Sequence, residues 1–221
     1  MRGKLFDNIE NTQNENLVFV QQNDYTLLVN LNGKVLARQG SMVAYKGDID
    51  FNYKGAGISR FLKSVATGEG MSLMEVSGTG DVYLANQANQ VHIVELNGDQ
   101  LTVTSRNVLA FTDGINWDIN VLKAGVTGFA AGGLFNTTLK GTGTIALTST
   151  GSPVVIPVKG GGVFADTNSI IAWSAGLNVS IKSTFKASSL IGRGSGESFQ
   201  MAFEGDGYIV VQPGEGIQIP R

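Results

Sequence analysis

Two closely spaced glycines, Gly78 and Gly80, open an apolar run in residues 78–85 (GTGDVYLA). The same pattern returns 63 positions later at 141–148 (GTGTIALT) and 64 positions after that at 205–212 (GDGYIVVQ). Self-similarity at a fixed period of this length is typical of a chain built from repeated structural units. These three segments therefore predict one structural unit used three times.

A second motif follows the same period. It comprises residues 41–45 (SMVAY), 107–111 (NVLAF) and 169–173 (SIIAW), which are 66 and 62 positions apart. Because two separate motifs share a period of about 64 residues, we interpret the chain as three tandem copies of one β-unit within a single domain, 1–221. The copies are circularly offset, so that the N-terminal part completes the last Gly-x-Gly strand. The predicted units are 17–67 with 194–221, 68–130 and 131–193.

The fold class expected from these patterns is all-β. Apolar runs of four to seven residues alternate with polar positions and end at Gly, Asn or Asp, as in a β-sandwich or barrel. Two Asn-Gly pairs, Asn32-Gly33 and Asn97-Gly98, stand between apolar runs and predict two-residue hairpin turns, since both turn positions need a positive φ. One short helix is expected over 59–66, with Ser59 as its N-cap.

The paired glycines have a structural interpretation. They are Gly78, Gly80, Gly141, Gly143, Gly205 and Gly207. We expect tight bends with positive φ, or close approach of two backbones at a corner. The alternative is a phosphate-binding loop, but no Gly-Lys-Ser/Thr motif is present and the segment 160–165 (GGGVFA) leads into another strand rather than a helix.

Composition excludes several kinds of site. The 221 residues contain no Cys, so disulfides, zinc fingers, iron–sulfur clusters and thiol nucleophiles are excluded. A single histidine rules out a multi-His metal centre within one chain. The net charge of −2 does not predict polyanion binding, and basic residues do not recur in register with the repeats, so nucleic acid is not an expected partner. No signal peptide or membrane-spanning apolar run is recognised, and we expect a soluble cytoplasmic protein.

Few residues are candidates for chemistry. His92 could act as a general base with Glu95, or it could be a structural strand histidine, which we favour. A carboxylate site for Ca²⁺ or Mg²⁺ remains open, although Asp48/Asp50 and Asp113/Asp118 lack the dense spacing of an EF-hand loop. We therefore assign no catalytic, metal-binding or cofactor-binding residue and no cofactor, and we expect that the protein is not an enzyme.

One aromatic residue recurs at the end of the second motif, as Tyr45, Phe111 and Trp173. These side chains could line three similar ligand pockets. We favour the other interpretation, in which each fills the core between two sheets.

The same residues carry a family resemblance. Residues 40–45 (GSMVAY), 60–62 (RFL) before 68–70 (GEG), and 205–213 (GDGYIVVQP) resemble the family named for altered inheritance of mitochondria protein 24, over roughly 25–216. The resemblance implies a bacterial member of uncharacterised function. It also implies a fold similar to the tryptophan RNA-binding attenuation protein: a double-stranded β-helix-like sandwich, repeated three times, in a trimeric assembly.

Association is the function that the sequence favours. Three β-units leave edge strands that natural proteins cover, often by forming oligomers. We expect a non-catalytic, homo-oligomeric structural or scaffold protein, most simply a homotrimer. The alternative is a binding module that holds a small molecule or a lipid head group in pockets between repeats or subunits.

Overall fold

The computed structural model describes residues 17–52, 72–122, 134–183 and 199–214. Within these ranges the regular structure is all-β, apart from one 3-10 turn, Ser105–Asn107. The expected fold class is confirmed at this level. The helix expected over 59–66 lies outside the described residues.

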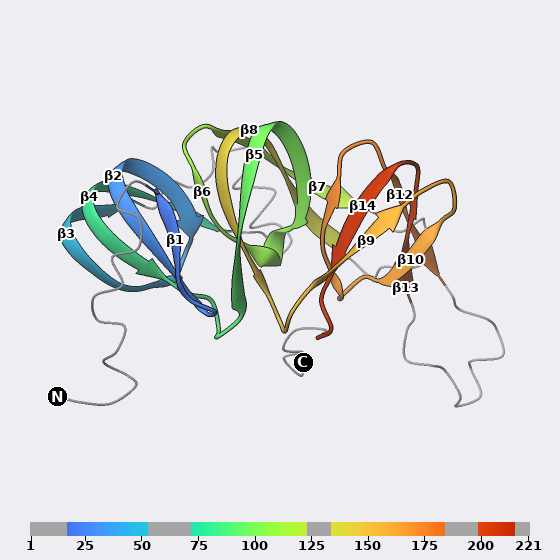
Figure 1. Ribbon diagram of the computed structural model, residues 1–221, viewed down its shortest axis with the longest axis horizontal. Coiled ribbons are helices and arrows are strands. Elements are labelled where there is room, and N and C mark those ends of the chain that lie inside the picture. Colours follow the sequence, from blue (N-terminus) through green and yellow to red (C-terminus); the bar gives the residue numbers. More distant parts are fainter. Residues whose placement is uncertain (1–16, 53–71, 123–133, 184–198, 215–221) are drawn as a thin grey trace.

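The strands form three lobes that lie side by side (Figure 1). The first lobe contains β1 (Phe19–Asn23), β2 (Thr26–Arg38), β3 (Met42–Asn52) and β4 (Leu73–Leu84). The second contains β5 (Gln90–Thr104), β6 (Val108–Thr112), β7 (Ile115–Leu122) and β8 (Leu134–Ser149). The third contains β9 (Val154–Val158), β10 (Val163–Asp166), β11 (Ile170–Ser174), β12 (Asn178–Ser183), β13 (Phe199–Glu204) and β14 (Gly207–Val211).

One 11-stranded antiparallel sheet runs through all three lobes, in the order β3-β4-β2-β6-β8-β5-β11-β14-β9 with β1 and β7 attached at β2 and β8. A 3-stranded sheet, β10-β13-β12, completes the third lobe. The lobes join where β2 pairs with β6 and where β5 pairs with β11.

The pairing groups differ from the boundaries expected from sequence. Strand β4 pairs with β2 and β3 of the first lobe, whereas the sequence predicts that β4 belongs to a separate second unit, 68–130. Likewise β13 and β14 pair with β9 to β12, rather than completing the N-terminal strands. Each lobe is instead continuous in sequence. A long final strand, β4 or β8, folds back onto the strands just before it in the first two lobes, and the shorter β13 and β14 do so in the third.

The two predicted Asn-Gly hairpins are wrong. Gly33 lies in the middle of β2, and β4 pairs with β2 without a break from Leu27↔Leu84 to Arg38↔Leu73. Gly98 lies in the middle of β5, at a register shift opposite β8. Both glycines do have positive φ, +125° and +76°. The positive φ therefore lies within a long paired strand, whose partner holds the chain extended on both sides, and not in a reversal of the chain.

The core consists of three hydrophobic clusters that cross the lobe boundaries. The first-lobe cluster includes Leu109 and Ala110 of β6. The central cluster takes Leu73 from β4 and Ile171 from β11. The third is built around Phe203 and its neighbours. The first two clusters thus include side chains of neighbouring lobes, and Leu122 and Leu134 of the second lobe pack against the third cluster. These contacts tie the three lobes together.

The recurrent aromatic residues fall into two environments. Phe111 and Trp173 are buried, as predicted, and each packs against another ring, Trp117 and Phe203 respectively. Tyr45 is 51% exposed, so the prediction of a core position is wrong for this residue. The reason is that β3 ends the path of the large sheet, and no described strand pairs with its outer edge.

Candidate functional site

The paired glycines mark places where two backbones meet. Gly78 and Gly80 lie within β4, Gly141 and Gly143 lie within β8, and Gly205 precedes β14, which begins at Gly207. Five of the six have φ between +118° and +156°. A Cβ at Gly78 would overlap the Asp48 carbonyl oxygen, and one at Gly207 would overlap the Ser174 hydroxyl. The space at these glycines is therefore taken up by the neighbouring strand or loop, and we assign them a structural role.

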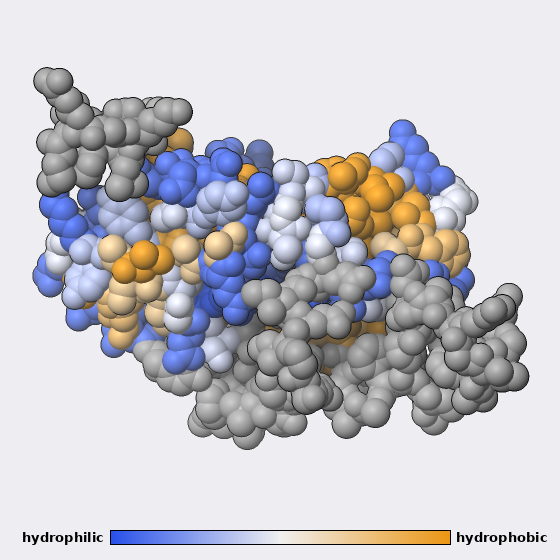
Figure 2. Space-filling view, turned by 90° about the horizontal axis from the view of Figure 1, so that it is seen from below, coloured by the Kyte–Doolittle hydropathy of each residue, from blue (hydrophilic) through white to orange (hydrophobic). Residues whose placement is uncertain are grey.

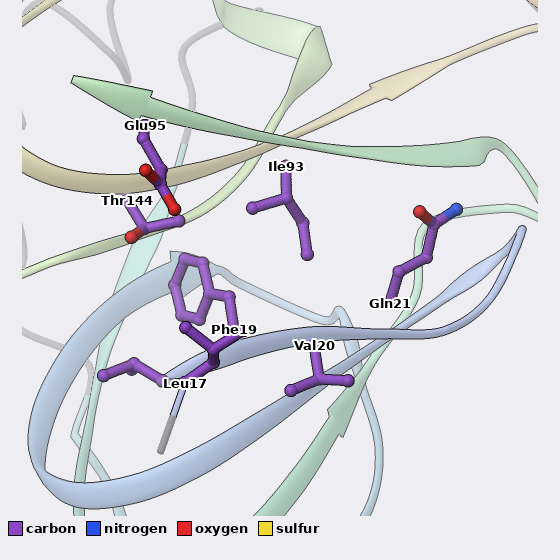
Figure 3. A pocket seen from close by; sticks show the side chains of 8 residues that line it. Leu17, Phe19, Val20, Gln21, Ile93, Glu95 and Thr144 are labelled. Atoms are coloured by element: carbon purple, nitrogen blue, oxygen red, sulfur yellow. The ribbon is translucent and has the colours of Figure 1, made fainter. Parts of the chain in front are cut away.

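A groove lies between the first and second lobes, where β1 faces β5 and β8 (Figure 3). Its volume is about 300 Å³, the lower end of the range for small-molecule sites. Its lining residues are Leu17, Val18, Phe19, Val20, Gln21, Ile93, Glu95 and Thr144.

Five of the eight residues that line this groove are apolar, and polar side chains lie at its ends. Figure 3 shows Phe19 below Ile93, Glu95 beside Thr144 at one end, and Gln21 at the other. The Gln21 Nε2 donates to the Val91 carbonyl oxygen at 3.1 Å, which fixes its amide. Glu95 is exposed and presents a carboxylate. The groove can therefore hold an apolar body that carries a cationic or hydrogen-bond-donating group.

Sequence reasoning did not find this groove. Its residues come from 17–21, 93–95 and 144, and no spacing rule connects segments so far apart. The sequence offered one indirect signal, the expectation of pockets between repeated units. The groove does lie between two lobes, but which residues line it depends on how β1 folds over the first lobe.

His92 contacts a residue that was not expected. Its Nε2 lies 2.6 Å from the Oγ of Ser149, a buried residue of β8, and burial lowers the pKa of His92. The Ser149 hydroxyl donates to the Gly151 carbonyl oxygen at 2.6 Å. A hydroxyl has one proton, so Nε2 must carry the proton and donate to Ser149. Glu95, the other suggested partner, lines the groove instead.

The direction of this hydrogen bond has a chemical consequence. A histidine that activates a serine accepts the hydroxyl proton at Nε2. Here the proton of Ser149 is directed to a backbone carbonyl, and the His92 nitrogen acts as a donor. The pair thus links the end of β8 to β5.

The carboxylates singled out in the sequence are dispersed. Asp113 forms an ion pair with Lys34, with 3.0 Å between its Oδ1 and the Lys34 Nζ, and this contact raises the pKa of the lysine. Asp48 and Asp50 lie on β3, and Asp118 lies on β7. Within the described ranges, no three His, Asp or Glu side chains lie close enough together to hold a metal ion. Nor does this part of the chain contain a helix of the length and apolarity needed to cross a bilayer.

A buried polar cluster joins the second and third lobes. The Asn107 Nδ2 donates to the Thr148 carbonyl oxygen at 2.7 Å. The Gln212 side chain accepts from the Thr150 N–H at 3.0 Å and donates to the Asn168 carbonyl oxygen at 3.3 Å. These bonds satisfy backbone groups at the ends of strands, which is a structural task. Sequence reasoning did not predict that Asn107 and Gln212 are buried.

Comparisons with known proteins give one family. The family model described as Mitochondrial biogenesis AIM24 matches residues 19–214. An uncharacterized protein of Streptococcus pyogenes serotype M6 is 29% identical over 194 residues, which cover 81% of this chain and 77% of the relative. The crystal structure of a Streptococcus pyogenes protein superposes with a TM-score of 0.69 at 27% identity, covering 88% of this chain and 91% of that one.

Proposed function

The chain belongs to the AIM24 family, whose model is described as Mitochondrial biogenesis AIM24, and we propose a function from the exposed surface of this chain. We propose that the protein is a non-catalytic structural protein that works as a homo-oligomer. A homotrimer in the bacterial cytoplasm is the form we propose, and the relatives found are bacterial. Nucleic-acid binding is not part of the proposal. The expected likeness to the tryptophan RNA-binding attenuation protein stays a prediction.

The observation that carries this proposal is the pair of exposed apolar strand edges. Met42, Val43 and Tyr45 are exposed on β3, at one end of the large sheet, and Phe164 is exposed on β10, at one edge of the 3-stranded sheet. Figure 2 shows apolar surface on both end lobes, separated by a polar middle. An unpaired apolar edge invites association, and soluble proteins usually charge it, shorten it or cover it.

A three-fold internal repeat is part of the same proposal. Two equivalent backbone hydrogen bonds support the repeat. In the first lobe the Ala85 N–H donates to the Ser41 carbonyl oxygen at 2.8 Å. In the third lobe the Gln212 N–H donates to the Ser169 carbonyl oxygen, also at 2.8 Å. Ser41 and Ser169 begin corresponding motifs of the sequence. If every lobe presents the same edges, a chain of three lobes ends with one free edge of each kind.

The oligomer is tested by light scattering over a dilution series. We expect the mass to approach three times 23.3 kDa at micromolar concentration and to fall on dilution. A strictly monomeric protein throughout the series would contradict the proposal.

A non-catalytic role is supported by the direction of the His92–Ser149 hydrogen bond, which leaves the hydroxyl unactivated. If an activity is discovered in the purified protein, it should survive the substitution His92→Ala. Loss of that activity with the fold intact would overturn this part of the proposal.

A second candidate function is supported by the groove between β1 and β5. It would hold a small molecule or lipid head group with a cationic amine beside Glu95 and an apolar body against Phe19 and Ile93. Native mass spectrometry of the freshly purified protein should then show a retained mass that is lost in Glu95→Gln. The matched control is Asp99→Asn, on the same strand but outside the groove, which should keep it. An unliganded spectrum of the wild-type protein argues against this candidate.

A further inference from the structure

We propose that copies of this chain join head to tail, with β10 of one copy pairing with the first half of β3 of the next, so that Phe164 lies opposite Tyr45. This inference rests on the proposed homo-oligomer and specifies its interface. It follows from the two junctions between lobes, which share one register.

At the first junction, β2 and β6 are antiparallel, with Val35↔Thr112, Leu36↔Phe111 and Ala37↔Ala110. At the second, β5 and β11 are antiparallel, with Leu101↔Ser174, Thr102↔Trp173 and Val103↔Ala172. In both, the strand that carries the recurrent aromatic pairs with the outer edge of the preceding lobe, and the aromatic itself occupies the central one of the three residue pairs.

The strand that offers its outer edge, β2 or β5 in the completed junctions, can be compared with β10 through the strand on its other side, which is β4, β8 or β13. Val35 is paired with the residue two positions before Gly78, and Leu101 with the residue two positions before Gly141. In the third lobe, Val163 is paired with Phe203, two positions before Gly205. Strand β10 therefore occupies the place that the second halves of β2 and β5 occupy, and its outer edge is free in the 3-stranded sheet.

The strand that carries the recurrent aromatic, β6 in the first junction, can be compared with β3 in the same way, through its pairing with β8 or β4. On β6, Phe111 is paired with Ile145 of β8, four positions after Gly141. On β3, Tyr45 is paired with Val82 of β4, four positions after Gly78. The first half of β3 thus matches β6 and β11, except that its outer edge has no strand beside it in the described chain.

Joining the two free edges in the shared register fixes the residue pairs. They are Val163 with Lys46, Phe164 with Tyr45, and Ala165 with Ala44. Among the described strands, β3 has a neighbour on one side only and β10 has a neighbour on one side only, so the proposed pairing displaces none of the pairings between them.

Exposure distinguishes the free edges from the completed junctions. Tyr45 is 51% exposed, whereas Phe111 and Trp173, at its matching position in the two completed junctions, are 0% and 5% exposed. Phe164 is 53% exposed, whereas its own counterparts are half-buried at Leu36 and buried at Thr102. Two large aromatic side chains are thus about half exposed at the pair of positions that the completed junctions cover more fully. A second copy of this chain presents the complementary edge.

One feature of the completed junctions is missing. The Arg38 Nε donates to the Val108 carbonyl oxygen at 3.0 Å, and the Thr104 Oγ1 to the Ile170 carbonyl oxygen at 2.8 Å. The corresponding residue of β10 is Asp166, whose carboxylate accepts from the Asn168 N–H at 2.6 Å and has no proton to donate. The junction between copies therefore lacks this bond, and we expect it to be weaker and reversible.

The test uses engineered disulfides, because the chain has no cysteine of its own. Directly opposed residues of antiparallel strands have Cα atoms about 4.5–5.5 Å apart, within the range a disulfide spans. Two variants are made separately, Tyr45→Cys and Phe164→Cys, then mixed and oxidised mildly. We expect a cross-linked dimer in the mixture and only background levels with either variant alone.

Val155→Cys is the matched control for the cross-link. It is an exposed apolar position on β9, outside the proposed pair, and should not cross-link with Tyr45→Cys. A cross-link that forms with either variant alone would indicate a symmetric contact and overturn the head-to-tail arrangement.

Charged variants test the same interface without a cross-linking reaction. Tyr45→Asp and Phe164→Asp should each reduce the mass in light scattering to that of one chain, with the circular dichroism unchanged. The control Tyr208→Asp, at another exposed tyrosine, should associate like wild type. If the wild type is oligomeric and both interface variants remain so, this interface is wrong although the proposed function stands. If the wild type is monomeric, the proposed function fails as well.

Discussion

At the scale of single residues, two glycines of the first lobe have nearly the same positive φ but differ in the space around them, so they allow backbone strain and steric overlap to be measured separately. Gly33 and Gly78 are paired across β2 and β4, with φ of +125° and +126°. A Cβ on Gly33 meets nothing within 4 Å, whereas one on Gly78 overlaps the Asp48 carbonyl of β3.

The two alanine substitutions should therefore differ. Gly33→Ala adds only an unfavourable φ, which costs about 1–3 kcal/mol. Gly78→Ala adds the same strain and must also push β3 from β4, so we expect its loss in the free energy of unfolding to be larger by about 1–2 kcal/mol. Urea unfolding at one protein concentration measures both. Equal losses would show that β3 moves aside without cost.

His92 should make stability depend on pH. Burial lowers its pKa in the folded protein below the ordinary value of 6.5, which it keeps in the unfolded chain. Between those two values the unfolded state binds more protons, so the free energy of unfolding rises with pH. The contribution is complete above about pH 6.5 and is lost as the pH falls through the lowered pKa.

The measurement is the urea midpoint at several pH values between 5 and 7.5. Wild type should lose more stability on acidification than His92→Gln, which retains a side-chain N–H for Ser149. Parallel pH profiles for the two proteins would show that His92 titrates equally in both states.

At the scale of strands, the recurrent aromatic occupies three positions in two environments. Phe111 and Trp173 are buried in completed junctions, and substitution of either by alanine should cost about 3–5 kcal/mol. Tyr45→Ala, measured at a protein concentration low enough to keep the chain monomeric, should cost less than about 1 kcal/mol. Urea unfolding gives all three values. A large loss for Tyr45→Ala in the monomer would mean that this side chain is buried within one chain.

The same strands show what sequence could and could not predict. Alternation and the two recurrent motifs predicted strands at β6, β11 and β14, because side-chain pattern is local information. The Asn-Gly rule failed at Gly33 and Gly98 because whether a positive φ reverses the chain or bends it depends on the partner strand. Tyr45 was misplaced for a related reason: burial of an edge strand depends on what lies beside it, and nothing in residues 41–45 says that β3 ends the sheet.

At the scale of the whole molecule, the groove between lobes and the buried Asn107 and Gln212 were beyond sequence reasoning. Both depend on contacts between segments far apart in the chain: Gln21 with Val91, Asn107 with Thr148, Gln212 with Asn168. Spacing carries no information about such pairs once the turns and bends between them are undetermined. The sequence could predict that lobes meet, but not which polar residues would lie between them.

The contacts between lobes also determine how the chain unfolds. Leu109 of the second lobe lies in the first cluster, and Ile171 of the third lobe lies in the central one, so melting one lobe uncovers apolar surface of its neighbour. Exposed apolar area costs about 25 cal/mol per Å², which couples the lobes energetically. We therefore expect one cooperative transition, although three lobes could in principle melt separately.

The two tryptophans report on this directly. Trp117 lies on β7 in the second lobe and Trp173 on β11 in the third, so Trp117→Phe and Trp173→Phe each leave a single probe. In each variant the fluorescence and circular dichroism transitions should coincide. Adding Gly78→Ala in the first lobe should shift both fluorescence midpoints by the same amount as the circular dichroism midpoint, because a cooperative chain shares its loss of stability. If the first-lobe substitution leaves the fluorescence of Trp173 unmoved, the third lobe unfolds independently, and the borrowed side chains do not couple the lobes.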